Sequence, residues 1–230
     1  MKKTPSPSST PHAPRPYSPA ETRSRILDAA ENLFASNGLD AVSIRDITGV
    51  AGVNLGAVNY HFGTRRDLVA AVFDRRMAPL TAERLAALGA LEQAAGKKAP
   101  ALEDVLEAFF LPAVRMSLGP EQDGAVFGRL MARCMLEPNP MLETLLRGHV
   151  EPVIRRFDAA LIRTLPRLRP ADVFWRMHLL IGGLHHSLLM HDRKLPAGKF
   201  PRMDVDTYTK RFVVFAAAAF RATEPVGDEP

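Results

Sequence analysis

Residues 43–68 hold the side chains whose types and spacing could do chemistry. Asn59, Tyr60 and His61 place an amide, a phenol and an imidazole at consecutive positions of one short predicted helix, where a core helix would carry aliphatic groups. Such groups hydrogen-bond to base edges and to phosphates, and a short helix fits the major groove of DNA, which is about 12 Å wide. The residue types therefore predict a helix that reads DNA.

Capping signals position this helix behind an earlier one. Ser43 and Asp46 form a capping box, so a helix is expected to begin at Ile44. Its inward stripe at helical spacing is Ile44, Ile47, Val50 and Ala51. Gly52 follows at once, and a left-handed glycine there lets the chain turn sharply. We therefore expect a helix, a tight turn and a second helix.

Asn54 supplies the cap of the second helix, which is expected to run to about residue 62. The inward-facing positions of this helix are Val58 and Phe62. Thr64 and Asp67 repeat the capping box and begin a third helix, whose first turn carries Arg65 and Arg66. Cations at a helix N-terminus oppose the helix dipole, so a bound phosphate is the partner that would favour them.

Two segments carry a resemblance to a known family. Residues 26–38 read ILDAAENLFASNG and residues 58–68 read VNYHFGTRRDL. Together they resemble the N-terminal DNA-binding region of the TetR/AcrR family of transcriptional regulators, from residue 25 to residue 73. The resemblance implies an all-α protein, in which a three-helix domain with a helix-turn-helix precedes a larger helical domain for ligand binding and dimerisation. Two positions depart from the family pattern: Arg65 replaces the usual lysine, and Asn59 replaces an aromatic residue.

The surface expected to meet double-stranded DNA follows from these positions. Asn59 and Asn54 are expected at base edges, with Arg45 at the start of the preceding helix, and the other polar members are expected to hold phosphates. The full predicted set is Ser43, Arg45, Asn54, Leu55, Gly56, Asn59, Tyr60, His61 and Arg65.

Length and composition fit two joined helical domains. The chain has 230 residues, of which 47% are hydrophobic, a net charge of +5 and one cysteine, Cys134. A single cysteine excludes an internal disulfide and favours a reducing compartment. No apolar run approaches the roughly 18 residues of a membrane span, and no signal-peptide core precedes the first helix. We expect a cytoplasmic protein without a membrane partner, divided into a basic tail (1–20), a helix-turn-helix domain (21–76) and an effector-binding and dimerisation domain (77–230).

Prolines and caps set the remaining boundaries. The proline-rich tail is expected to be disordered, with a minor-groove arm as the alternative. Ser18 and Glu21 cap a helix that begins at Pro19, and Gly38 ends it. Pro79 is expected to end or bend the helix that contains it. Further helices are expected over residues 81–95, 101–118, 124–136, 141–147, 150–165, 171–191 and 204–222, and no β pattern is present.

The last two of these helices carry more apolar surface than a helix with one buried face needs. Their large apolar residues include Trp175, Leu179, Leu180, Ile181, Leu184, Leu188, Leu189, Phe212, Val213, Phe215 and Phe220. A large monomer core would account for this surface. Self-association through a two-fold helical interface would also account for this apolar surface. A protein that binds a palindrome through the major groove needs two-fold symmetry. TetR/AcrR dimers are built from their last two long helices, so we expect a homodimer.

Aromatic residues, methionines and isolated cations share the middle helices. A cavity with an apolar wall and one or two cations would suit a long apolar acid, whereas an ordinary core with arginines reaching solvent is the alternative. The candidate effector residues are Phe109, Arg115, Met116, Phe127, Arg129, Met131, Arg133, Met135 and His178. The segments AGVNLGAVNYHFG and DVFWRMHLLIGGLHHSL also resemble the PsrA-like branch of the family, which implies a fatty acid or acyl-CoA effector.

Other chemistry finds little support in the sequence. His185 and His186 diverge by about 100° on a helix, and no cysteine or acid stands at a ligand spacing beside them, so no metal and no cofactor are expected. Cys134 has no local histidine or aspartate to activate it, so an enzyme is not expected. The alternative to a regulator is a helical small-molecule or lipid carrier that has lost DNA binding.

Overall fold

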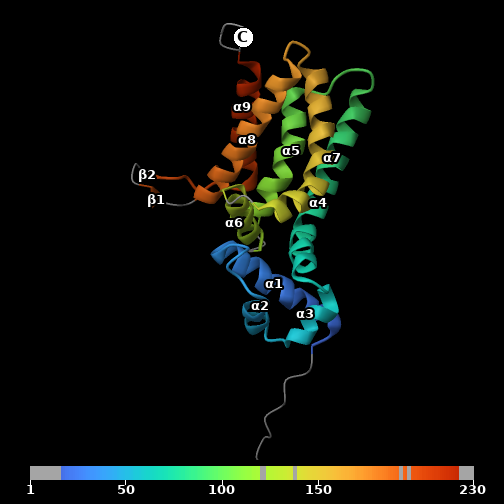
Figure 1. The fold of residues 1–230 in the computed structure, drawn as a ribbon. Coiled ribbons are helices and arrows are strands. Elements are labelled where there is room, and N and C mark those ends of the chain that lie inside the picture. Colours follow the sequence, from blue (N-terminus) through green and yellow to red (C-terminus); the bar gives the residue numbers. More distant parts are fainter. Residues whose placement is uncertain (1–16, 120–122, 137–138, 192–193, 196–197, 223–230) are drawn as a thin grey trace, which may run out of the picture.

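The computed structural model describes residues 17–119, 123–136, 139–191, 194–195 and 198–222. Its helices form a small head at one end and a longer bundle at the other (Figure 1). The helices are α1 (Pro19–Asn37), α2 (Ile44–Ala51), α3 (Leu55–Phe62), α4 (Arg65–Ala95), α5 (Leu102–Leu118), α6 (Asp123–Leu136), α7 (Pro140–Thr164), α8 (Pro170–Met190) and α9 (Val205–Arg221). The predicted all-α class is confirmed, and most of the predicted tail lies outside the described residues.

In the head, α1 packs against α2, α3 and the first half of α4. The centre of this packing is apolar and fully buried, and includes Ile26, Phe34, Ile47, Val58 and Phe73. Three capping boxes begin its helices as predicted, pairing Ser18 with Glu21, Ser43 with Asp46, and Thr64 with Asp67. The caps satisfy amide groups that have no partner inside a helix, so the helix starts are fixed locally.

The prediction for Pro79 was wrong in part, because α4 does not end there. The helix runs unbroken from the head into the bundle, with Pro79 exposed inside it. Proline removes one hydrogen bond of the helix. Met77 and Leu80 on either side are buried, and α4 packs against both α5 and α7, so tertiary packing outweighs that loss. The predicted domain boundary between residues 76 and 77 therefore falls within one continuous helix.

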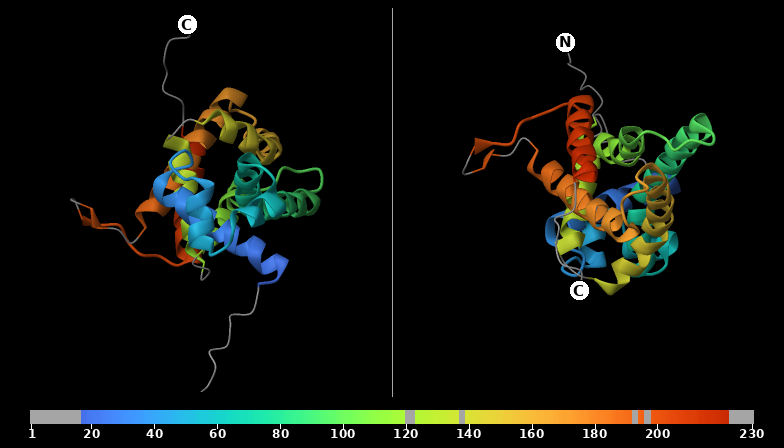
Figure 2. Two further views of the ribbon diagram at one scale, coloured as in Figure 1. Left: turned by 60° about the horizontal axis from the view of Figure 1, so that its bottom comes forward. Right: turned by 90° about the horizontal axis from the view of Figure 1, so that it is seen from above.

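Three further expectations differ from the structure. The two helices expected over 141–147 and 150–165 form the single helix α7, which buries Val153 and Phe157 along its length. Val50 was assigned to the inward stripe of α2 but is 61% exposed. Thr48 is buried in its place and donates a hydrogen bond to the carbonyl of Arg45 at 3.0 Å. Although no β pattern was seen, β1 (Lys194–Leu195) pairs antiparallel with β2 (Gly198–Lys199), away from the bundle (Figure 2).

The bundle is organised around α5, which packs against α4, α6, α7, α8 and α9. Aromatic rings fill its centre, with Phe109 edge-on to both Phe110 and Phe157 at centroid distances of 5.0 Å. Helix α6 joins this bundle to the head, since it packs on α1 and Arg133 donates to the carbonyl of Ser36 at 3.0 Å. Among the described residues, no helix combines the length and the apolar character that crossing a membrane requires.

Candidate nucleic-acid interface and ligand pocket

Helix α3 turns its predicted reading face to solvent. Tyr60 is 81% exposed and Leu55 is 49% exposed, and Asn59 is exposed between them in the chain. The opposite face buries Val58 and Phe62, as predicted. Because two inward anchors fix the short helix on the head, its polar face is held outward on a rigid support.

Several of the predicted DNA contacts already serve the fold. The Asn54 side-chain oxygen accepts a hydrogen bond from the amide of Ala57 at 2.9 Å, which leaves its amide N–H group for a base edge. The Ser43 hydroxyl donates to the Asp46 carboxylate at 2.7 Å and accepts from the Asp46 amide at 3.2 Å. Ser43 is therefore committed as a helix cap, and its role at DNA stays a prediction.

Arg25 stabilises the turn between α2 and α3 by a hydrogen bond to the end of α2. Its Nε donates to the carbonyl of Ala51 at 2.9 Å, at the C-terminus of α2. Gly52 has a φ of 66°, which favours glycine, and a Cβ there would lie 3.1 Å from Arg25. Gly56 is tight too, since a Cβ would lie 3.2 Å from the Asn54 oxygen. These contacts fix the turn that joins α2 to α3.

Arg65 was predicted to contact a phosphate, but in the structure its guanidinium is bound within the protein. Its Nη2 donates to the carbonyls of Leu39 and Val42, the second at 3.1 Å, and its guanidinium lies over the Phe34 ring. The residue is thereby tied to the link between α1 and α2. Arg66 in the same turn is exposed, as is Arg45 at the start of α2. His61 is half-buried and packs edge-on to Tyr60, with 5.0 Å between ring centroids.

The acids near this face are held by the caps. Hydrogen bonds from the Ser43 side chain and then its backbone lower the pKa of Asp46. Hydrogen bonds from Thr64 do the same for the pKa of Asp67. Both carboxylates are therefore ionised at neutral pH, but they are engaged with their own caps. Arg45 and Arg66 are exposed cations that an anionic partner could reach.

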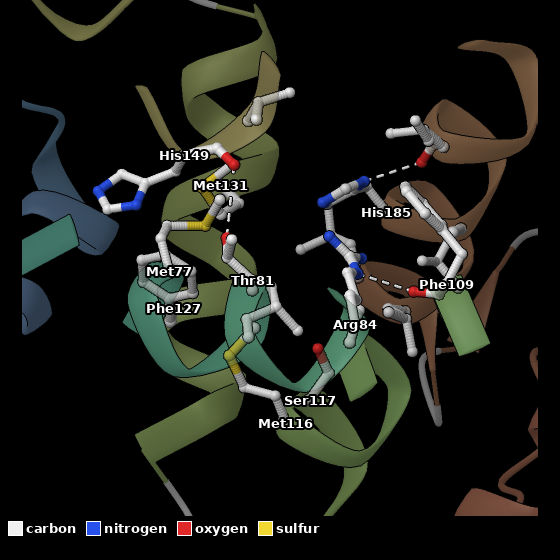
Figure 3. A pocket seen from close by; sticks show the side chains of 18 of the residues that line it. Met77, Thr81, Arg84, Phe109, Met116, Ser117, Phe127, Met131, His149 and His185 are labelled. Carbon is white, nitrogen blue, oxygen red and sulfur yellow. Dashed lines mark hydrogen bonds between the residues drawn. The ribbon is translucent and has the colours of Figure 1, made fainter. Parts of the chain in front are cut away.

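A pocket of about 320 Å³ opens in the bundle between α4, α5, α6, α7 and α8. Its wall is mainly apolar (Figure 3). Five of the predicted effector residues line it: Phe109, Met116, Phe127, Arg129 and Met131. Its volume is near the lower end of the roughly 300–1,000 Å³ typical of small-molecule sites.

Three other predicted effector residues lie elsewhere. Arg115 is exposed and pairs with Glu83 at the surface. Arg133 points to the head, and His178 is exposed and stacks on Phe174 with 5.9 Å between the rings. A cation on an apolar helix can lie on its buried or its exposed side. The rotation of each helix about its axis places these three side chains outside the pocket. The side chain of Met135 lies outside the described residues.

The sequence reasoning missed two polar residues of the pocket, Arg84 and His185. The signal for Arg84 was available, because it lies four residues after Leu80 and four before Leu88, in the buried stripe of α4. For His185 the sequence pattern raises only the question of a metal site, and it does not indicate a pocket residue. The described part of the chain contains no group of three or more residues suited to hold a metal ion.

Comparison with known proteins assigns both halves of the chain. A model of bacterial regulatory proteins of the tetR family matches residues 26–72, and a model of the tetracyclin repressor-like C-terminal domain matches residues 107–219. The chain belongs to the TetR family. This family consists of regulatory proteins, so the prediction that the chain is not an enzyme is confirmed.

Curated relatives, named as HTH-type transcriptional regulators, match over part of the chain. A transcriptional repressor of Mycobacterium tuberculosis is 49% identical over 61 residues, which are 26% of this chain and 32% of the relative. The repressor BepR of Brucella suis is 30% identical over 115 residues, which are 50% of this chain and 52% of BepR. This chain thus covers about a third of the first relative and half of the second.

Solved structures extend the likeness of fold over nearly the whole chain. The fatty acid degradation regulator FadR of Bacillus halodurans has a TM-score of 0.63 at 15% identity, covering 88% of this chain and 97% of its own. The regulator FadR of Bacillus subtilis in complex with stearoyl-CoA has a TM-score of 0.59 at 16% identity, covering 85% and 98%. The predicted arrangement of a helix-turn-helix head and a larger helical domain is confirmed, whereas the PsrA-like branch is not.

Proposed function

We propose that this TetR-family chain is a DNA-binding repressor of transcription that a small apolar ligand releases from its operator. The observation that carries the proposal is α3, which holds Val58 and Phe62 in the head and exposes Asn59 and Tyr60. Exposed Arg45 and Arg66 stand near it for phosphate contacts. Two relatives are named transcriptional repressors. A protein that binds operator DNA is expected in the cytoplasm.

The operator is expected to be a palindrome bound by a dimer. Apolar side chains stand exposed on α8 and α9, which pack against each other (Figures 1 and 2). They are Phe174, Trp175, Leu179, Val214 and Phe215. Exposed apolar side chains on two neighbouring helices favour self-association, and a two-fold dimer would place its reading helices about one DNA turn apart or slightly more.

Helix α4 is the expected link between ligand and DNA. Its first half packs in the head, and its second half carries Leu80, Thr81 and Arg84 in the pocket wall. A small rotation of this helix on ligand binding would change the spacing of the two heads. A coupling of roughly 1–3 kcal/mol would lower operator affinity about 5- to 150-fold. An effector resembling a fatty acid or acyl-CoA agrees with the pocket's apolar wall and with the stearoyl-CoA complex of FadR from Bacillus subtilis.

The test is selection of bound duplexes from a random DNA pool, with and without a medium-to-long-chain fatty acid or acyl-CoA. We expect a palindrome to be enriched and the enrichment to fall with ligand. In the same assay, Asn59→Ala should relax preference at particular base pairs, by about 1–3 kcal/mol per contact. The matched control is Val50→Ala, an exposed change on α2 outside the predicted surface, which should keep the wild-type preference.

A carrier that has lost DNA binding remains the other function to be tested. If no duplex is enriched at low salt, where phosphate contacts are strongest, the regulator proposal fails and the carrier is supported. If a palindrome is enriched but the acids and acyl-CoA have no effect, the regulator stands and the effector class fails. An equal loss at every base pair for Asn59→Ala would refute its role in reading sequence.

A further inference from the structure

The pocket has an unusual charge composition. Its described lining contains no aspartate or glutamate, and every ionisable side chain in it is an arginine or a histidine. These residues are Arg84, Arg129, His149, His185 and His191. Two of the histidines are engaged elsewhere: His149 pairs with Asp74 at 2.7 Å, and His191 is held by the backbone of Met203. Arg129 is exposed. Arg84 is thus the buried member of this set, and His185 is half-buried.

Arg84 is fixed from one side only. Its Nε donates to the carbonyl of Phe109 at 2.8 Å, and its guanidinium carbon lies 4.2 Å from the centre of the Phe109 ring. Burial lowers the pKa of Arg84 to about 10, so the group remains charged at neutral pH. The carbonyl and the ring hold the guanidinium in one orientation, which reduces the entropy lost when a ligand binds it.

The charge of Arg84 has no carboxylate partner among the described residues. Glu83 precedes it in the chain but pairs with Arg115 at the surface. The two terminal nitrogens of Arg84 have no hydrogen-bond acceptor in the described part of the protein. A buried ion without a partner is strongly unfavourable, so this guanidinium is best satisfied by an anion that enters the pocket. A carboxylate matches its two parallel N–H groups.

His185 lies on the same wall as Arg84 (Figure 3). Its Nδ1 is 2.8 Å from the carbonyl of Ile181, so Nδ1 carries the proton and donates it. Burial, and to a lesser extent the charge of Arg84, lower the pKa of His185. The neutral ring therefore adds no second fixed charge and leaves Nε2 as an acceptor. The rest of the wall is apolar, with Phe127, Met131, Val153 and Leu188 among its residues.

From this arrangement we propose that Arg84 is the carboxylate-binding residue of the pocket, and that its ligand is an unconjugated monocarboxylic acid with an apolar body. This inference rests on the proposed function only in using the same pocket as the effector site. A free acid suits a cavity of 320 Å³ with a single buried guanidinium. Extra phosphates, as in an acyl-CoA, would find no further buried arginine in the described lining.

Calorimetric titration of the full chain without DNA tests the proposal, with decanoate and decan-1-ol as probes. Decanoate should bind the wild type, and Arg84→Met should weaken it at least about thirtyfold, as for removal of one partner from a buried charged pair. Arg84→Lys keeps the charge but loses the paired N–H groups, and should fall between the two. Arg115→Met, which removes an exposed arginine on α5, is the matched control and should leave decanoate binding unchanged.

Decan-1-ol shows whether Arg84→Met loses decanoate binding because the positive charge is missing or because the cavity is damaged. It should bind the wild type more weakly than decanoate does, and should bind Arg84→Met as well as the wild type. Acids from hexanoate upward should gain up to about fourfold in affinity per methylene until the cavity is full. The proposal is overturned if no acid binds, if decan-1-ol matches decanoate on the wild type, or if Arg84→Met keeps decanoate affinity. The selection of DNA duplexes without ligand tests the proposed DNA-binding function separately, because its result does not depend on whether the protein binds these acids.

Discussion

Arg65 and Arg66 occupy one helical turn but differ in their contacts, because Arg65 binds backbone carbonyls and Arg66 is exposed. Arg65→Ala removes a guanidinium from the carbonyls of Leu39 and Val42, and should lower the free energy of unfolding by about 1–3 kcal/mol. Arg66→Ala changes an exposed side chain and should stay within about 0.5 kcal/mol of the wild type. Denaturant unfolding measures both. On DNA, Arg66→Ala should reduce the salt slope by about 1. Equal stability of the two variants would contradict the carbonyl contacts of Arg65.

His185 should make the stability of the protein depend on pH. Burial lowers its pKa below the ordinary value of 6.5, so the unfolded chain binds more protons than the folded one in this range. Its contribution is complete above pH 6.5 and is lost as the pH falls through the unfolded and then the folded pKa. His185→Asn keeps an N–H for the Ile181 carbonyl but cannot titrate, so its melting temperature should fall less between pH 7 and 5. His186→Asn, at an exposed neighbour, should follow the wild type.

At the scale of elements, a cluster of ion pairs connects α1 to α4. This charged joint consists of Asp28 and Glu31 on α1 and of Arg75 and Arg76 on α4. Glu31 is 1% exposed and receives hydrogen bonds from Arg75 and Arg76, the second at 3.2 Å. Glu31→Gln keeps the shape but removes the buried negative charge that both guanidinium groups bind, and should cost about 3–5 kcal/mol in unfolding free energy. Asp28→Asn is the matched change, because Asp28 also binds Arg75 at 2.5 Å but is about half exposed. It should cost no more than about 1 kcal/mol.

This joint lies on the same helix as the pocket, so it also bears on the proposed switch. Arg75 and Arg76 are followed on α4 by Met77, Leu80 and Thr81, which line the cavity. If the joint transmits rotation of α4 to the head, Glu31→Gln should reduce the effect of ligand on operator affinity more than Asp28→Asn does. An equal ligand effect in the two variants, measured by titration of DNA, would remove the joint from the switch.

At the scale of the whole molecule, the exposed apolar face of α8 and α9 predicts a dimer. Val214 on α9 is 68% exposed and Val50 on α2 is 61% exposed, so they form a matched pair. Val214→Lys should place a charge in the interface and shift the mass measured by light scattering toward the monomer. Val50→Lys should leave the mass unchanged. A wild-type monomer at micromolar concentration, or a Val214→Lys dimer, would count against this interface.

Local signals in the sequence determined most of the head. The capping residues Ser43 and Thr64 fix helix starts by bonds within three residues, and Gly52 fixes the turn by its own backbone freedom. Such features depend on neighbours in the chain, so one sequence is enough to place them. The same reasoning misjudged Val50, because on a helix of only two turns a small rotation exchanges a buried position for an exposed one.

The sequence by itself therefore determined the helical class, the cap and turn residues of the helix-turn-helix, and the outward chemistry of α3. Only the tertiary structure decided that α4 passes through Pro79 unbroken, since packing on α5 and α7 outweighs the loss of one hydrogen bond. It also decided which arginine is buried in the pocket wall: this is Arg84, whereas Arg129 lines the pocket but is exposed, and Arg115 and Arg133 point elsewhere. That choice depends on how helices far apart in the chain are rotated against one another, and helix rotation is set by the summed packing of the whole bundle.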